Sequence, residues 1–148
     1  MADPIFAIAR SALDVERQRL AVIAQNLANA GTTGQIYSPK RLISGPQSIP
    51  SFTGMLGTQG ATEDRQASLA LSGVQSYGVE EIDAAPRRVH EPENPAADES
   101  GYVNYPGVNQ AEEMALLVQT LRVYEANVVM CNAARAMFMR AMDIGGKS

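Results

Sequence analysis

The sequence predicts a mainly α fold, in which long N- and C-terminal helices pair as a coiled coil and flank a small, irregular, β-containing middle. Gly and Pro gather between residues 31 and 107, so the two ends can be helical and most of the middle cannot. Apolar residues at both ends recur every 3.5 residues on average, the spacing typical of a coiled-coil seam. Only 5% of the 148 residues are aromatic and Trp is absent, which disfavours one large globular core. These observations divide the chain into segments 1–30, 31–108 and 109–148.

The N-terminal helix is expected from about Pro4 to about Ala30. Asp3 is a suitable N-cap, and Pro4 suits the first helical position because its missing N–H has no partner to lose there. Gly31 is a candidate for the left-handed residue that often ends a helix. Alternating steps of three and four residues trace a seam that only Glu16 interrupts, and its apolar members are Phe6, Ala9, Leu13, Leu20, Ile23, Leu27 and Ala30.

The middle segment carries weak strand signals between breakers. Short alternating or β-branched runs indicate strands near Ser68–Val74, Gly78–Ala84 and Gly101–Tyr105. The polar sequence around them is typical of loops.

The C-terminal helix is expected from about Gln110 to about Ile144, with Asn109 as its N-cap and Glu112 completing a box-like arrangement. Gly145 and Gly146 would end it. Its seam is interrupted only by Arg135 and consists of Met114, Leu117, Leu121, Tyr124, Val128, Cys131, Phe138 and Met142.

A second apolar row on the same helix repeats every seven residues, about 100° from the first. Together the two rows span roughly 160°, wider than the stripe of about 100° that one partner covers. Two interpretations follow: the N-terminal helix and the middle cover both rows in a monomer, or the second row packs against other subunits. The members of the second row are Leu116, Val123, Met130, Met137 and Ile144.

Composition excludes several functional classes. A net charge of −4 and a pI near 5.0 disfavour a protein that binds nucleic acid through a basic surface. No apolar stretch approaches the roughly 18 residues of a membrane span, so no direct membrane insertion is expected. The N-terminus lacks the basic and long apolar regions of a cleavable signal peptide. The protein is therefore expected to be cytosolic, or exported without cleavage.

No group of residues indicates catalysis, a cofactor or a metal. His90 is the only His and lies in a charged, Pro-rich segment, so we expect it to be solvated. Cys131 has no second Cys or His beside it and is expected to pack on the helix seam. The glycines of "GMLGTQG" (54–60) match no phosphate-binding loop, and "PENPAADESG" (92–101) lacks the ligand spacing of a calcium loop. We expect the latter to be a solvated turn and the protein not to be an enzyme.

Two stretches resemble the bacterial flagellar rod and hook proteins. "LAVIAQNLANAGTTG" (20–34) resembles their N-terminal signature, a helix that ends in an Asn- and Ala-rich stretch before a Thr. "GVEEIDAAPRRVHEPENPAADESG" (78–101) and the following residues to Gly145 are similar to the C-terminal part of the proximal rod members. Gln25 and Gly107 depart from that pattern, and residues 44–66 match it poorly. The matching signature residues are Asn26, Asn29, Thr32, Tyr102, Tyr105, Pro106, Glu113, Met114, Arg122, Tyr124 and Asn127.

The resemblance implies a structural subunit of the proximal rod of the flagellar basal body. In this family the terminal helices pair, and many copies pack side by side into a tube that transmits torque across the periplasm. It implies as partners copies of the chain and other rod proteins in a helical assembly, the inner-membrane ring and export apparatus at the rod base, and the flagellar type III export machinery. The alternatives are another rod or hook subunit, or a soluble helical adaptor or export chaperone.

Overall fold

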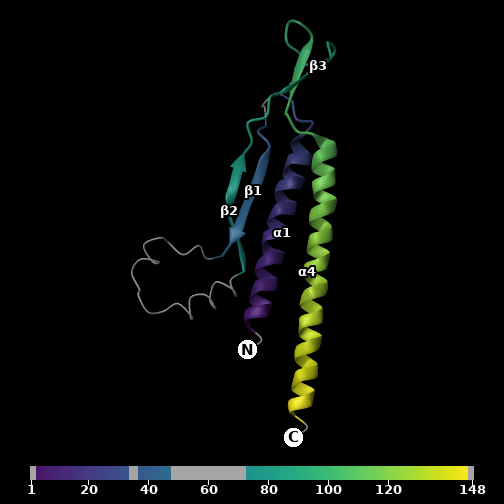
Figure 1. Ribbon diagram of the computed structural model, residues 1–148. Coiled ribbons are helices and arrows are strands. Elements are labelled where there is room, and N and C mark those ends of the chain that lie inside the picture. The colour runs from purple at the N-terminus through teal and green to yellow at the C-terminus, as the bar shows by residue number, and fades with distance from the viewer. Residues whose placement is uncertain (1–2, 34–36, 48–72, 147–148) are drawn as a thin grey trace, which may run out of the picture. The chain divides into compact units, whose positions relative to one another are not determined.

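The computed structural model describes residues 3–33, 37–47 and 73–146 (Figure 1). A helix stands at each end of this part of the chain and short strands lie between them, which confirms a mainly helical protein with a small β-containing middle. The elements in chain order are α1 (Asp3–Asn29), β1 (Lys40–Pro46), β2 (Val74–Glu81), β3 (Arg87–His90), β4 (Tyr102–Tyr105) and α4 (Gln110–Gly145). Pairing of the two helices as a coiled coil stays a prediction.

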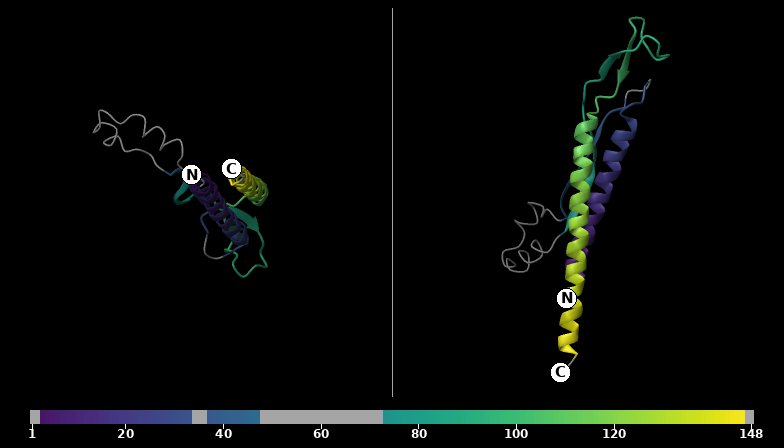
Figure 2. Two further views of the ribbon diagram at one scale, coloured as in Figure 1. Left: turned by 90° about the horizontal axis from the view of Figure 1, so that it is seen from below. Right: turned by 90° about the vertical axis from the view of Figure 1, so that its right-hand side faces the viewer.

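The chain divides into two compact units, and each unit takes a part of both helices. Unit 1 comprises residues up to Glu16, from 44 to 77, and from 123 onward. Unit 2 comprises Arg17–Ile43 and Gly78–Arg122. Although the boundary falls inside α4, that helix has no break in its ribbon (Figure 2).

Both helices begin and end close to the expected residues. Asn109 caps α4 as predicted, because its Oδ1 accepts hydrogen bonds from the backbone N–H groups of Ala111 at 3.2 Å and Glu112 at 3.4 Å. The last turn of α1 ends differently from the expectation. Gly31 does not have a positive φ, so the prediction of a left-handed end there was wrong. Instead, the N–H of Thr32 bonds to the carbonyl of Asn29 at 3.1 Å, which closes a tight final turn.

The strands form two separate two-stranded sheets. β1 pairs with β2, and the N–H of Ile82 bonds to the carbonyl of Pro39 beside this pair at 2.7 Å. β3 pairs antiparallel with β4, with Val89 opposite Val103. The strand expected at 101–105 is confirmed as β4, and the one expected at 78–84 overlaps the end of β2. The one expected at 68–74 lies mostly outside the described residues, as does the Gly-rich stretch 54–60.

The connection between β3 and β4 is a solvated turn, as predicted, and Asp98 organises it. Its Oδ1 accepts from the backbone N–H groups of Ser100 at 2.9 Å and Tyr102 at 2.8 Å. Its Oδ2 accepts from the guanidinium of Arg88 at 2.8 Å. The hydrogen bond from the Tyr102 N–H is the main reason that the pKa of Asp98 lies below its usual value, and the bonds from Ser100 and Arg88 add to the effect.

The buried core lies mostly in unit 2. α1 contributes Val22 and Ile23, and β1 contributes Leu42. Val103 of β4 is almost fully buried, at 1% exposed. In unit 1, Val15 of α1 is buried. Among the described residues, unit 2 therefore contains most of the buried apolar side chains. It also contains most of the signature residues.

Candidate assembly surface and the buried polar junction

Asn26 joins helix α1 to the segment that leads into β1. Its side chain is 1% exposed, and its Nδ2 donates to the backbone carbonyl of Lys40 at 2.8 Å. Its Oδ1 accepts from the N–H of Lys40 at 2.9 Å and from the hydroxyl of Tyr37 at 2.8 Å. The amide thus pairs with both backbone groups of one residue, as a neighbouring strand would. This explains why an Asn, with a donor and an acceptor on one short side chain, suits this position.

The electrostatics of this junction involve Tyr37 and two carboxylates. Burial raises the pKa of the Tyr37 phenol above its usual value, and the negative charges of Glu113 and Glu81 raise it further. The hydroxyl therefore stays protonated at neutral pH and can donate to Asn26.

Glu113 is the second buried polar side chain of the junction and stands in the first turns of α4. It is 4% exposed, and its Oε1 lies 3.8 Å from Nη2 of Arg41 in β1. Glu112 lies at the same distance from that nitrogen but is largely exposed. Thr120, also buried, bonds back to the carbonyl of Leu116 at 2.8 Å. The part of α4 in unit 2 thus buries polar side chains, which the apolar seam did not predict.

Three signature residues lie in the β3–β4 hairpin or directly after it. The hydroxyl of Tyr105 donates to Glu91 at 2.9 Å, which raises the pKa of the Tyr105 phenol. Hydrogen bonds from Asn94 and then from Tyr105 lower the pKa of Glu91. Tyr102 lies under the guanidinium of Arg88, 4.8 Å from the ring centre, and Pro106 is fully buried.

His90 is exposed, as expected, and packs edge-on against the ring of Tyr102 with 5.0 Å between ring centres.

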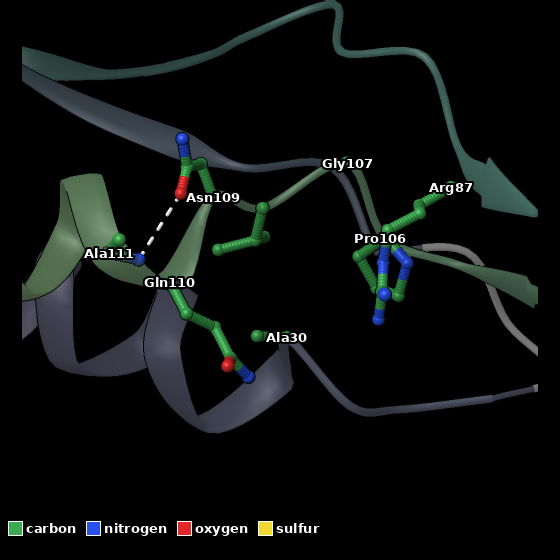
Figure 3. A pocket seen from close by; sticks show the side chains of 8 residues that line it. Ala30, Arg87, Pro106, Gly107, Asn109, Gln110 and Ala111 are labelled. Carbon is green, nitrogen blue, oxygen red and sulfur yellow. Dashed lines mark hydrogen bonds between the residues drawn. The ribbon is translucent and has the colours of Figure 1, made fainter. Parts of the chain in front are cut away.

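A hollow of about 430 Å³ lies at the start of α4 (Figure 3). Arg87, Pro106 and Ala30 contribute to its lining, and the Asn109 amide in it is already bonded to the helix. Gly107, a departure from the family pattern, also lines it. A Cβ at this position would lie 2.5 Å from the carbonyl oxygen of Ala85, so the backbone approaches there too closely for a side chain.

The predicted seam residues differ in their exposure. On α1, Ile23 is buried at 2%, and Phe6, Leu13, Leu20 and Leu27 are half-buried. On α4, the half-buried members are Leu117, Tyr124, Val128 and Cys131, and the exposed members are Met114, Leu121, Phe138 and Met142.

The second row on α4 is largely exposed. Leu116 is half-buried, but Val123, Met130, Met137 and Ile144 are 42%, 65%, 64% and 77% exposed. Three further large apolar side chains on α4 that neither row includes are also exposed, namely Val118, Val129 and Met139. A count of every apolar residue around the helix, rather than of two rows, would have included them. A set of apolar side chains this large on one helix is typical of an interaction surface.

The described residues contain neither a cluster of potential metal ligands nor a helix apolar and long enough to cross a membrane.

Two protein-family models match the ends of the chain. Residues 6–34 match the model described as flagella basal body rod protein, and residues 99–144 match the model described as flagellar basal body rod FlgEFG protein C-terminal. Curated relatives match over nearly the whole length. The flagellar basal-body rod protein FlgC of Escherichia coli O6:H1 is 37% identical over 145 residues, which are 95% of this chain and 96% of the relative. The chain belongs to the FlgC family of flagellar basal-body rod proteins.

Further FlgC relatives include those of Bacillus subtilis and Salmonella typhimurium, each 34% identical over 145 residues. The matches cover 93% and 95% of this chain, and 94% and 96% of the respective relatives. The chain is accordingly a structural subunit of the basal-body rod, and its family is one of structural proteins rather than enzymes.

The signature residues fall unevenly on the two units. Tyr124 and Asn127 belong to unit 1. All the others belong to unit 2: Asn26, Asn29, Thr32, Tyr102, Tyr105, Pro106, Glu113, Met114 and Arg122. Asn26, Glu113 and Pro106 are each buried there.

Proposed function

We propose that the subunit polymerises through its terminal helices, and that the second apolar row of α4 packs against neighbouring rod subunits, copies of this chain included. The observation that supports this is the exposure of Val123, Met130, Met137 and Ile144, all apolar, on one face of a helix. Fully burying an exposed side chain of this kind is worth about 1.5–3 kcal/mol, and because these four are only 42–77% exposed, covering the rest of each contributes roughly half of that before ordering costs. A row of four could therefore supply much of the free energy of a lateral contact.

We further propose that the subunit stands in the proximal rod and transmits torque across the periplasm toward the distal rod. Long helices packed along their length can pass a twisting load between subunits without any chemistry. On this proposal the other partners are the inner-membrane ring and export apparatus at the rod base. The flagellar type III machinery would deliver the chain.

The first experiment replaces Val123 or Met130 with Asp. The charge would be buried without a partner in the lateral contact, which is costly, so cells should export the subunit but not swim. Asn132→Asp is the matched control: it adds the same charge to an exposed polar site about 200° around the helix from Met130. Swimming in soft agar and subunit export into the medium are measured together. Normal swimming by Val123→Asp cells would rule out the second row as an assembly face.

A second pair of variants tests the seam. Val128→Asp places the charge at a half-buried position, where we propose that α4 packs against α1 of the same chain. This variant should lower the helix content of the purified subunit, measured by circular dichroism, whereas Met130→Asp should not. Equal helix content in the two variants would contradict the division into an internal seam and an external row.

A further inference from the structure

The methionines of α4 are all exposed. More than half of each side chain is accessible to solvent, and the residues are Met114, Met130, Met137, Met139 and Met142. A packed Met is a flexible apolar side chain that fills gaps in a core or an interface. An exposed Met also offers its thioether sulfur to small oxidants, which convert it to the sulfoxide. The exposed surface of α4 thus carries a reactive group as well as apolar area.

Met130 and Met137 have little local protection. On a helix, a side chain is flanked by the residues three and four positions away. Three of the four such neighbours are Ala for Met130, and three of the four are Ala for Met137. The methyl group of Ala is too short to cover a thioether, and the two Met side chains are 65% and 64% exposed. The neighbouring alanines are Ala126, Ala133, Ala134 and Ala141.

The same two methionines lie on one face of the helix. They are seven residues apart, which places them within about 20° of each other around the helix axis. Ala133 and Ala134 lie between them and flank both. Met130 and Met137 also belong to the second apolar row, which we propose packs against neighbouring subunits. Their sulfur atoms would therefore be open to solvent before assembly and covered after it.

We propose that Met130 and Met137 form a peroxide-sensitive modification site, and that their oxidation blocks incorporation of the subunit into the rod. This inference rests on the proposed role of the second row. In the modifying step the thioether sulfur attacks one oxygen of hydrogen peroxide, so that an S–O bond forms while the O–O bond breaks. The sulfur is oxidised by two electrons to the sulfoxide, and the other oxygen takes both hydrogens and leaves as water.

The sulfoxide opposes assembly because it is polar. A polar group buried without a hydrogen-bond partner is unfavourable, and the flanking alanine side chains have no donor to offer. Each sulfoxide buried in the lateral contact should weaken that contact about tenfold or more. The block is reversible, since methionine sulfoxide reductases restore the thioether, with one enzyme for each epimer of the sulfoxide.

The first test is chemical. The purified full-length chain is treated with hydrogen peroxide, and the sites that gain oxygen are mapped by peptide mass spectrometry. Met130 and Met137 should be oxidised as readily as Met in a short peptide, and both reductases together should reverse the change. Failure of these two residues to take up oxygen, at a dose that fully oxidises such a peptide, would overturn the proposal.

The second test measures assembly. The double variant Met130→Leu, Met137→Leu keeps apolar side chains of similar volume and removes both sulfur atoms. Met139→Leu is the matched control, because it removes a thioether that is 56% exposed and lies about 180° around the helix from Met130. Cells make the subunit during a peroxide pulse, and new basal bodies are counted. The double variant should still form them at a dose that stops the wild type and Met139→Leu. Equal peroxide sensitivity of all three strains would contradict the inference.

A third variant separates this inference from the proposed function. The double change Met130→Gln, Met137→Gln imitates the polarity of the sulfoxide without an oxidant and keeps a good helix former at both sites. Its cells should form few basal bodies. If they swim normally while Met130→Asp cells do not, the row is an assembly face and only the oxidation proposal is wrong. If Met130→Asp cells swim normally too, the proposed function is wrong and the oxidation proposal is refuted with it.

Discussion

Asn26→Ala should destabilise the subunit far more than Asn29→Ala. Both residues are Asn on the last turns of α1, so the change in helix propensity is the same. Asn29 is half-buried and makes one exposed hydrogen bond, to the carbonyl of Gln25 at 2.8 Å. Asn26 is buried and makes three, which join α1 to Lys40 and Tyr37.

The magnitude follows from these bonds. A neutral intramolecular hydrogen bond contributes about 0.5–1.5 kcal/mol net, so three contribute roughly 1.5–4.5 kcal/mol. Lys40 is only half-buried, and water can replace part of what its backbone loses. We therefore expect Asn26→Ala to lower the free energy of unfolding by about 2–3 kcal/mol, and Asn29→Ala by less than about 0.5 kcal/mol. Against a typical total of 5–15 kcal/mol, the first loss is large.

The assay is urea unfolding of the full-length chain, followed by circular dichroism, with amide exchange at Lys40 as the local readout. Faster exchange of the Lys40 N–H in Asn26→Ala than in Asn29→Ala is expected, because only the first change removes its acceptor. If the two variants unfold at the same urea concentration and Lys40 exchanges equally, then Asn26 does not hold β1 to α1.

Three further outcomes are expected. The pKa of Asp98 is lowered in the folded hairpin. The contribution of Asp98 to stability is therefore present above the usual Asp pKa of about 3.9 and is lost as pH falls through the folded pKa. Asp98→Asn should remove this acid dependence, which the Tyr102 amide signal reports in NMR titrations. In the isolated chain, hydrogen exchange should be slower in residues 110–122 than in residues 129–142. Equal protection would contradict the proposal that the C-terminal half of α4 needs neighbouring subunits to cover it. Cys131→Ala should leave swimming nearly intact, since removing one small half-buried group costs about 1–2 kcal/mol, and a thiol reagent should label Cys131 faster in the isolated chain than in intact basal bodies.

The sequence predicts the helices well because their signals are local. Residues that start or stop a helix affect only the nearest turn or two, and Pro4, Asn109 and Gly145 are of this kind. Both helices accordingly begin and end within about two residues of the expected places. β3 was not predicted, because only one of its four residues, Val89, is apolar, and the strand is held by pairing with β4 and by the Asp98 turn. β1 was not predicted either, because it contains Gly45 and ends at Pro46, residues that are typical of loops.

The junction could be predicted only in part. The family resemblance marks Asn26 and Glu113, but periodicity gives no reason for a polar side chain to be buried on either helix. The partners of Asn26 lie 11 and 14 residues further along the chain, in a segment without a strong strand pattern. Such contacts depend on how the chain returns over α1, which a helical repeat does not contain.

The distribution of buried residues along α4 bears on how the rod subunit becomes ordered. The two buried side chains of this helix, Glu113 and Thr120, both belong to unit 2. From Val123 onward α4 has several half-buried residues and many exposed apolar ones. Most of the stability of a helix in a protein comes from packing of its apolar face, and an exposed apolar surface adds no stability until something covers it. The chain thus completes one part of α4 with its own buried contacts, and the ordering of the other part should depend on neighbouring subunits, which would couple folding of the helix to its incorporation into the rod.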